Sequence, residues 1–406
     1  MQNNEYREVY LGELLEGTIR NGYSPLPADK LTGYWVLGLG ALGDDGIRVN
    51  EVKPVIPEVS VLQNILNIDD FLVSRSNTPD KVGRSIRFQG EIENCSFPDL
   101  MMRFRIDKNK ADICYMEQIL KSFNVRNYFK SCAAGSSSTM VKINKGILEK
   151  TPIFLPSLNQ QKKIAEILSA WDQAISLTEK LLENSQQQKK SLMQQLLSGK
   201  KRLLDESGLN VTTPWEKYRL GMLLKEEKQR NKHNSISRVL SVTNHSGFVL
   251  PENQFSKRIA SDEVSNYKIV RKGQFGYNPS RINVGSFARL DQFENGLLSP
   301  MYVVFSIKSE KLDSDFFLYW MKSNEAKQRI NNSTQGSVRD SVGFDAISSF
   351  VLKLPEIQEQ RKIAKVLYLA DQEIENLYKK IDCLKQEKKA LMQQLLTGKK
   401  RVKVAA

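Results

Sequence analysis

The sequence has 406 residues, of which 40% are hydrophobic and 26% are charged, and its formal net charge is +14. This length predicts two or more packed domains, because a domain usually takes about 100–200 residues. No apolar run approaches the roughly 18 residues that a membrane span needs, and the polar first residues exclude a signal peptide, so no membrane partner is expected. The positive charge favours a polyanionic partner such as nucleic acid, although a lysine-rich soluble surface gives the same balance.

Histidines and cysteines are too few or too scattered for a catalytic or metal centre. His233 and His245 are the only histidines, and the four cysteines lack metal-ligand spacing. We therefore expect no catalytic residue, no metal and no cofactor in this chain, which binds rather than catalyses. The cysteines are interpreted as reduced, buried thiols of a cytosolic protein: Cys95, Cys114, Cys132 and Cys383.

Residues 1–155 alternate short β-like runs with turn signals and predict a mixed α/β domain. Strands are expected at residues 36–37, 71–73 and 101–106, and residues 115–129 have helical periodicity. The loops carry groups suited to DNA, because arginine forks fit guanine edges while serine and lysine fit phosphates, although any single such loop is usually a solvated turn. The candidate DNA-binding residues of this domain are Tyr23, Ser24, Ser74, Arg75, Lys81, Arg84, Ser136, Ser137 and Lys142.

The glycines of residues 38–43 match the spacing of a dinucleotide-binding fingerprint. Such a loop needs a helix directly after it to meet the phosphates. Here two aspartates and a glycine follow at residues 44–46, and prolines follow at 54 and 57. We therefore interpret this run as a turn and not as a cofactor loop.

Residues 156–205 predict a long helix that ends at a glycine cap. Pro156 suits the first turn, Gly199 suits the C-terminal cap, and no proline or glycine lies between them. Apolar residues step by four and three along this segment, which is typical of a coiled-coil seam. The seam is assigned to Ile164, Leu168, Trp171, Ile175, Leu182, Leu192 and Leu196.

Residues 206–354 predict a second mixed α/β domain. Strands are expected at residues 275–277 and 302–307, and residues 315–330 have helical periodicity. Its candidate DNA-binding residues are Asn278, Ser280, Arg281, Asn283, Gln335, Ser337 and Arg339. Residues 277–280 faintly resemble the Asn-Pro-Pro-aromatic motif of amino-methyltransferases, but the second proline and the aromatic residue are missing, so catalysis is rejected here.

Residues 355–406 predict a second long helix, which repeats the first one. Leu155 and Pro156 recur as Leu354 and Pro355, and from there to the end about half of the aligned positions are identical without a gap. Its seam is assigned to Ile363, Leu367, Ile374, Leu377, Ile381, Leu384, Leu391 and Leu395. Lys189 and Lys388 interrupt the two seams at equivalent positions, where they either fix the register or lie past the tight seam and reach water.

The chain is therefore a tandem duplication with a pseudo-twofold internal repeat. The predicted domains are 1–155, 156–205, 206–354 and 355–406, and the fold class is α/β (α+β) domains in tandem, separated by two long helices that form an antiparallel coiled coil. The similar helices indicate that both meet one kind of partner, and the diverged domains indicate two different targets. An old duplication whose domains have simply drifted is the alternative.

Several of these segments resemble the specificity subunits of type I restriction–modification systems. Residues 155–165, with Gln161 leading into Lys163-Ile164-Ala165, resemble the start of the central helix of that family, and residues 354–364 resemble its second copy. Residues 391–401 resemble the C-terminal segment of the family. Residues 70–75 resemble one variety of target-recognition domain, and residues 277–286 and 299–302 resemble another.

The resemblance implies that each variable domain is a target-recognition domain that contacts one half of a split, asymmetric site on double-stranded DNA. The paired helices then set the length of the unread spacer, and two modification (methyltransferase) subunits dock on them. S-adenosylmethionine, ATP and magnesium are expected on those partners and on restriction (translocase or nuclease) subunits where these are present. A cytoplasmic protein of a bacterium or an archaeon is implied. Because the two domains look like different varieties, residues of one are not mapped onto the other.

Two other functions remain open from the sequence. One is a self-contained DNA methyltransferase or nuclease, which the missing cofactor and carboxylate motifs oppose. The other is a coiled-coil adaptor that does not bind DNA.

Overall fold

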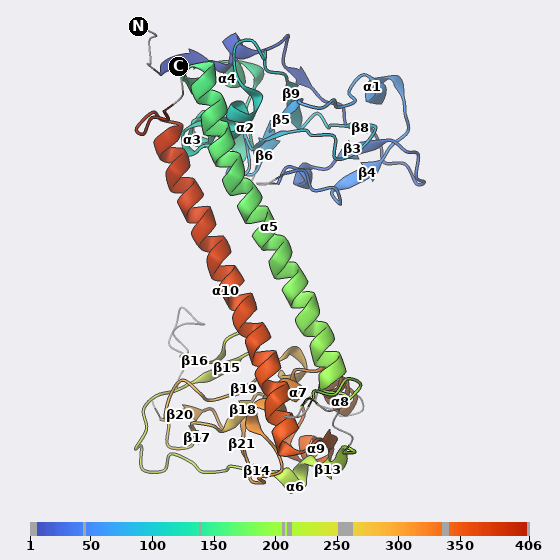
Figure 1. Cartoon of the computed structure of the whole chain (residues 1–406), viewed down its shortest axis with the longest axis vertical. Coiled ribbons are helices and arrows are strands. Elements are labelled where there is room, and N and C mark those ends of the chain that lie inside the picture. The colour runs from blue at the N-terminus through green and yellow to red at the C-terminus, as the bar shows by residue number, and fades with distance from the viewer. Residues whose placement is uncertain are drawn as a thin grey trace. The chain divides into compact units, whose positions relative to one another are not determined.

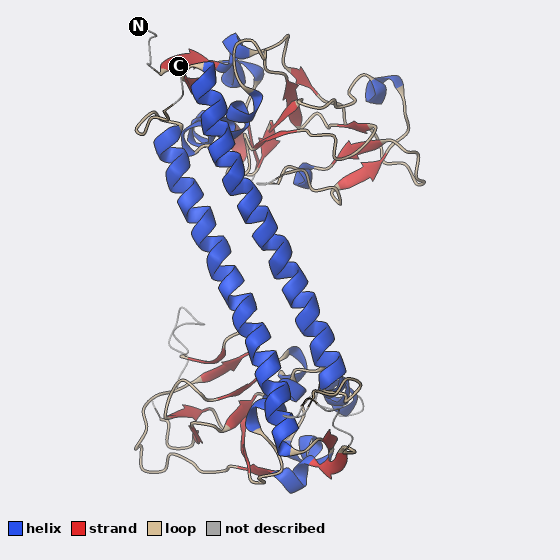
Figure 2. Ribbon diagram, in the orientation of Figure 1, coloured by secondary structure: helices blue, strands red, loops and turns tan. Residues whose placement is uncertain are grey.

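The computed structural model describes residues 6–43, 46–137, 140–204, 208, 213–250, 263–334 and 341–403 (Figure 1). The chain divides into two compact units, Met1–Lys180 with Lys379–Ala406, and Leu181–Tyr378. Each unit therefore combines one variable domain with parts of both long helices. Helices and strands occur together in both units (Figure 2), so the α/β fold class is confirmed.

The first unit is built around a four-stranded antiparallel sheet in the order β2 (Arg20–Asn21), β9 (Met101–Phe104), β5 (Phe71–Ser74) and β7 (Ser85–Arg87). Three smaller sheets surround it: β1 (Arg7–Tyr10) with β12 (Pro152–Leu155), β10 (Ala134–Ser137) with β11 (Met140–Lys142) and β6 (Ser76–Asn77), and β4 (Val52–Pro54) with β3 (Trp35–Leu37) and β8 (Cys95–Ser96). Its short helices are η1 (Leu11–Leu14), η2 (Leu39–Ala41), α1 (Val59–Leu62), α2 (Ile113–Lys121), α3 (Phe123–Cys132) and α4 (Lys145–Glu149).

The second unit repeats this plan with a sheet in the order β14 (Leu224–Glu226), β21 (Val303–Ile307), β18 (Phe275–Tyr277) and β19 (Phe287–Arg289). The smaller pairs are β13 (Glu216–Arg219) with β22 (Val351–Leu354), β15 (Ser241–Thr243) with β16 (Gly247–Val249), and β17 (Lys268–Arg271) with β20 (Asn295–Leu298). Its short helices are α6 (Leu220–Leu223), η4 (Ile282–Val284), α7 (Ser314–Met321), α8 (Asn324–Thr334) and α9 (Phe344–Ser349).

Equivalent aromatic pairs in the two central sheets show that the two units share one architecture. Phe71 pairs in register with Phe104, and their rings stack with centroids 5.4 Å apart. Phe275 pairs in register with Phe305, and those rings stack at 5.3 Å. Aromatic residues in neighbouring strands bury large apolar areas, which fits strand formation at the predicted residues 71–73 and 275–277.

The helices predicted from periodicity at residues 115–129 and 315–330 are each broken in two. Ser122 takes an extended conformation that ends α2, and its side chain accepts a hydrogen bond from the backbone N–H of Val125 to begin α3. Ser323 accepts in the same way from Ala326 between α7 and α8. Serine is a favourable N-cap, so a periodic apolar pattern can run through a cap that periodicity does not detect.

Two helices of 39 residues each, α5 (Leu158–Leu196) and α10 (Ile357–Leu395), confirm the long helices expected from the repeat. Every residue assigned to the two seams is buried or half-buried. The ends of the seams pack into the domain cores: Ile164, Leu168 and Leu395 join the core of the first unit, and Leu196, Ile363 and Leu367 join that of the second. The heptad pattern therefore combines coiled-coil contacts with domain contacts.

The glycines that end the helices are required by their backbone conformation. Gly199 and Gly398 both have φ of +71°, which places them in the left-handed region expected of a C-terminal cap. A Cβ added to Gly199 meets the Trp215 ring at 3.3 Å, and one added to Gly398 meets the Tyr6 ring at 3.1 Å. In both copies, the glycine that follows the long helix therefore lies against an aromatic ring.

Lys189 and Lys388 form ion pairs between the two helices. In the first unit Lys388 donates to Asp172 at 2.5 Å, and in the second unit Lys189 donates to Asp371. Both lysine side chains are largely buried, with 14% and 20% of their surfaces exposed. Each pair joins a lysine of one long helix to an aspartate of the other. These pairs therefore favour the interpretation that the lysines fix the register.

A buried glutamine in each helix fastens the helix to its domain. Gln161 accepts from the backbone N–H of Asp112 and donates to the carbonyl of Pro156, both at 2.8 Å. Gln360 accepts from Asp313 at 2.8 Å and donates to Pro355 at 2.9 Å. Both side chains have 1% or less of their surface exposed, so these bonds are shielded from water.

Replacing Gln360 with alanine is expected to destabilise the second unit by about 1–3 kcal/mol for each buried backbone group left without a partner. A urea unfolding curve measures this as a lower midpoint. Gln358→Ala is the matched control, because Gln358 is exposed two residues earlier on the same helix turn. Equal midpoints for the two variants would show that the buried amide contributes nothing.

The expectation that all four cysteines are buried is wrong. All are free, but only Cys95 is buried, Cys114 and Cys132 are half-buried, and Cys383 is exposed. Cys383 lies on the solvent side of α10, where residues between the seam positions face water. Burial raises the pKa of the Cys95 thiol to about 12, whereas a hydrogen bond to Glu387 raises the pKa of Cys383.

Alkylation of the native chain at pH 8 is therefore expected to modify Cys383 well before Cys95. With a pKa of about 12, only about one in ten thousand Cys95 thiols is ionised at that pH, and the side chain is also shielded. Mass spectrometry of time points measures the order of labelling. Labelling of Cys95 at the rate of Cys383 in the folded chain would contradict its placement in the core.

Candidate nucleic-acid interface

A structurally equivalent hairpin in each unit carries some of the predicted DNA-binding residues: Arg75, Lys81 and Arg84 in the first unit, and Asn278, Ser280, Arg281 and Asn283 in the second. In the first unit the hairpin joins β5 to β7 through residues 75–84, and in the second it joins β18 to β19 through residues 278–286. The strands β5 and β18 hold the third place in their sheets, and β7 and β19 form the edge beside them. The two hairpins are thus structurally equivalent, and the DNA-binding roles of their residues stay predictions.

The first hairpin forms one wall of a small polar pocket of about 290 Å³. Ser74, Lys81 and Arg84 line it together with Asn77 and Arg48. The opposite wall is Leu39, Gly40 and Leu42 from the glycine-rich run. Three predicted residues and two further polar ones therefore converge on a cavity with an excess of positive charge.

Internal hydrogen bonds hold the polar groups of this pocket in place. Ser74 is buried, and its hydroxyl accepts from the side-chain amide of Asn77 at 3.2 Å. The Arg84 guanidinium donates to the carbonyl of Leu42 at 3.2 Å, so it anchors the hairpin to the glycine-rich run. Lys81 is exposed, and its ammonium has no partner within the described part of the chain. Lys81 is therefore the group of this pocket that is most available to a ligand.

The glycine-rich run of residues 38–43 does not have the surroundings of a phosphate-binding loop. Its only helical part is the 3-10 turn η2, and the next element with described residues is β4, followed by α1 from Val59. A phosphate-binding loop needs a helix N-terminus directly after the glycines. The run acts here as a wall of the pocket.

Arg75 begins this hairpin, and two more candidates of the first domain lie near it. Arg75 donates to the backbone carbonyl of Asp99 at 3.4 Å, and the hydroxyl of Ser24 donates to the carboxylate of the same aspartate. Lys142 on β11 pairs in register with Ser76 on β6, directly after Arg75. Ser24 and Lys142 thus come from distant parts of the sequence to the start of the hairpin.

The structure says less about the remaining three candidates of this domain. Tyr23 is partly exposed, and a hydrogen bond to Glu58 raises the pKa of its hydroxyl. Ser136 and Ser137 belong to β10, whose partner is β11, but their side chains lie outside the described residues. These three residues stay predictions without a described place in the pocket.

The second hairpin exposes its candidate side chains on a fixed backbone. Asn278 is buried and its side-chain oxygen accepts from the backbone N–H of Ser280 at 3.0 Å, which shapes the turn. Ser280, Arg281 and Asn283 are exposed. The Arg281 guanidinium has no partner among the residues that the structure describes. This leaves its five N–H donors available for a base edge.

The segment after α8 meets the same hairpin. The backbone N–H of Val342 donates to the carbonyl of Pro279 at 3.0 Å, and α8 packs against η4 of the hairpin. Gln335, Ser337 and Arg339 lie outside the described residues. Tyr277, which precedes the hairpin, is completely buried, so it belongs to the core and not to the binding surface.

Sequence reasoning missed Arg48 as a lining residue. Arg48 reaches the pocket because its backbone N–H donates to the carbonyl of Ala41, which folds the chain back beside the hairpin. That contact is tertiary and leaves no pattern in the sequence. Asn77 lay inside the run of polar residues that follows β5, so its type and position were detectable.

The described residues offer no site for metal chemistry and no membrane span. Among them, no three His, Cys, Asp or Glu side chains are grouped so that they could hold a metal ion. In the same part of the chain, no helix is both long and apolar enough to cross a membrane.

The fold defines a class of protein with two equivalent mixed α/β domains, each followed by a long helix. The model of the type I restriction modification DNA specificity domain matches the chain twice, at residues 63–185 and 258–386, which is more than half of its length. The chain belongs to this family of type I specificity subunits.

Two relatives agree with this assignment, and two solved structures share the fold. The putative MjaX specificity subunit of Methanocaldococcus jannaschii is 27% identical over 425 residues, which cover 98% of this chain and 94% of that protein. The MjaVIII specificity subunit of the same organism is 27% identical and covers 73% of this chain and 72% of its own length. The fold is shared with the type I restriction–modification S subunit of M. genitalium at a TM-score of 0.58 and 14% identity, with 98% of this chain and 97% of that chain covered. A chain from a structure that concerns assembly and conformational transition of the type I system gives 0.57 and 14%, with 97% of each chain covered.

Proposed function

We propose that this specificity subunit reads an asymmetric, bipartite site on double-stranded DNA and directs adenine methylation and restriction by partner subunits. One observation carries this proposal. The same hairpin recurs at the same place in both units with different exposed side chains. A single scaffold with two different surfaces fits the reading of two different half-sites.

The chemistry of the exposed groups supports contact with base edges. Arg281 and Asn283 in the second hairpin present a guanidinium and an amide, which recognise guanine and adenine in the major groove. Lys81 and Lys142 in the first unit present ammonium groups that suit phosphates. The net charge of +14 favours approach to DNA through long-range attraction.

The long helices support a second part of the proposal, which is that they set the spacer and carry two modification subunits. Both helices repeat the same sequence pattern and the same lysine–aspartate pair. Two equal surfaces suit two copies of one partner. S-adenosylmethionine on the modification subunits, with ATP and magnesium on restriction subunits, would supply the chemistry, and this chain itself is proposed to hold no cofactor.

Selection from a pool of random duplexes tests the proposal. The full chain, assembled with its modification subunits, is expected to enrich two short blocks of fixed sequence separated by an unread spacer of constant length. Enrichment of one continuous block would contradict two reading domains. No enrichment together with no affinity would support an adaptor, and methyl transfer by the purified chain alone would support a self-contained enzyme.

A further inference from the structure

The second unit contains a concave site that carries more positive charge than its hairpin at residues 278–286. It is a pocket of about 750 Å³ between the end of α5 with the residues that follow it, from Gln186 to Lys200, and the α7–α8 junction, from Lys322 to Lys327. Five lysines line it, with Glu325 as the single carboxylate. The lysines are Lys189, Lys190, Lys200, Lys322 and Lys327.

Some of the charged side chains that line this pocket form ion pairs, and others do not. Lys189 is paired with Asp371, and Glu325 is paired with Arg329 at 2.7 Å, so neither neutralises another lining group. The ammonium groups of the other four lysines have no carboxylate partner within the described ranges. Four cations that form no ion pair among the described residues, in one cavity, attract a ligand with several negative charges.

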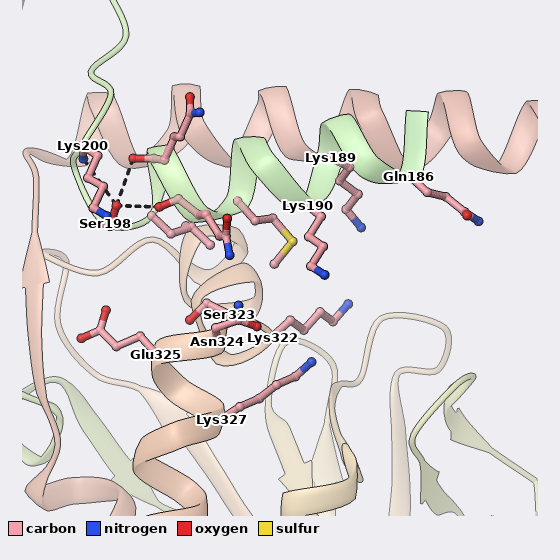
Figure 3. A pocket seen from close by; sticks show the side chains of 14 residues that line it. Gln186, Lys189, Lys190, Ser198, Lys200, Lys322, Ser323, Asn324, Glu325 and Lys327 are labelled. Atoms are coloured by element: carbon pink, nitrogen blue, oxygen red, sulfur yellow. Dashed lines mark hydrogen bonds between the residues drawn. The ribbon is translucent and has the colours of Figure 1, made fainter. Parts of the chain in front are cut away.

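The lysines of the two walls point toward one another. Figure 3 shows the ammonium groups of Lys190 on α5 and of Lys322 and Lys327 gathered at one end of the pocket, while Glu325 points toward the other end. The surrounding protein atoms partly desolvate the Lys322 ammonium and lower its pKa, and the Lys189 charge lowers it further, while the Asp371 carboxylate opposes this shift. A bound anion would relieve both effects.

The equivalent pocket of the first unit has different chemistry. It has a volume of about 310 Å³ and lies between the last turns of α10 and the α2–α3 junction, so it repeats the same architecture. There Lys121 is paired with Glu117 at 2.9 Å, Arg126 donates to the carbonyl of Val82, and Phe123 is exposed. The cluster of unpaired lysines is thus specific to the second unit and is not needed to build the fold.

This asymmetry argues against an identical partner subunit as the occupant, because two copies of one partner would meet two equivalent surfaces. The position of the pocket argues for DNA, because α8 bounds the pocket and also packs against the hairpin at residues 278–286. From Gln186 to Leu196 the α5 wall is about 15 Å long, a length over which one DNA strand carries roughly four phosphates. Lysine recognises phosphates as a mobile point charge.

We infer that this lysine pocket binds backbone phosphates of the DNA strand next to the half-site that the second hairpin reads. The pocket holds the duplex in register for Arg281 and its neighbours without reading bases. This inference rests on the proposed function and deepens it. It also predicts that the second half-site contributes more salt-dependent affinity than the first.

The triple variant Lys190→Gln, Lys322→Gln and Lys327→Gln tests the inference in the full chain assembled with its modification subunits. The dissociation constant for a duplex that contains the selected site is measured across a range of KCl concentrations. Each lost phosphate contact lowers the slope of log affinity against log salt by about 0.9, so a decrease of about two to three is expected. The selected half-sites are expected to stay the same.

The matched control removes three charges elsewhere: Lys217→Gln, Lys353→Gln and Lys389→Gln. Lys217 and Lys353 are register partners on β13 and β22, and Lys389 is the counterpart of Lys190 in the first unit. The slope of this control is expected to fall by less than one. An equal fall in both variants would mean that only total charge matters, which overturns the inference.

Four further outcomes separate failure of the inference, other sources of negative charge, and failure of the proposed function. If the wild-type complex binds DNA with sequence preference and the triple variant keeps its slope, the inference fails while the proposed function stands. If inorganic tripolyphosphate binds the wild-type chain and not the triple variant, with the DNA slope unchanged, the ligand is a free polyphosphate and the DNA assignment is wrong. If the triple variant loses assembly with the modification subunits, an acidic protein segment occupies the pocket instead. A wild-type complex without any sequence preference would refute the proposed function itself.

Discussion

Adding four residues to both long helices is expected to lengthen the unread spacer of the DNA site by about two base pairs and to leave both half-sites unchanged. Four helical residues add about 6 Å, and DNA rises 3.4 Å per base pair. The insertions are placed after Lys180 in α5 and after Tyr378 in α10, at the boundaries along the chain that divide the two units. Site selection with the variant measures spacer and half-sites together.

The same insertion in α5 alone is the control, and it is expected to damage the protein. The contact of Asp172 with Lys388 and that of Lys189 with Asp371 both depend on one register between the helices. A one-sided insertion shifts that register by about one turn, so one of the two contacts must be lost. A lower melting temperature and lost sequence preference would follow. If instead the matched insertion changed the half-sites and kept the spacer, the helices would not set the spacing.

Replacing Arg281 with alanine is expected to relax recognition at one position of the half-site read by the second domain. The guanidinium is exposed on the hairpin and lacks a described partner, so its removal leaves the fold intact. A bidentate contact with a base contributes about 1–3 kcal/mol of discrimination, which is about 5- to 150-fold. Binding to duplexes changed at one base at a time measures this loss.

Two controls define the origin of that effect. Arg75→Ala is expected to change only the other half-site, because Arg75 is the first residue of the hairpin of the first unit. Arg361→Ala removes an exposed arginine at the start of α10 and is expected to change neither. Arg84 is a poorer probe than Arg75, because its bond to Leu42 anchors the hairpin. A uniform loss across all duplexes with Arg281→Ala would indicate a phosphate contact.

The duplicated architecture was predictable from the sequence because repetition and periodicity are local patterns. The 39-residue helices, the glycine caps and the strands at 71–73 and 275–277 follow from residue types at fixed spacings. The matching hairpins followed from polar residues that come directly after those strands. Each of these features depends on residues that are close in sequence, so this single sequence was sufficient to predict them.

Features that depend on tertiary contacts were not predictable in the same way. The break at Ser122 is hidden inside an apolar periodicity that continues across it. Arg48 reaches the pocket through a backbone bond to Ala41, and the lysine pocket joins two segments more than a hundred residues apart. The seam residues Ile164 and Leu395 have coiled-coil spacing but pack in a domain core, because the same spacing buries a helix face against any apolar surface.

Mapping of methylated bases in the host genome, with and without this gene, tests the central claim most directly. The account predicts that one split motif, with an adenine methylated in each half and a spacer of constant length, disappears when the gene is removed. Restoring the gene with Arg281→Ala should return the motif with one relaxed position in one half only. Loss of a continuous motif, or an unchanged pattern in cells that express the modification subunits, would contradict the account.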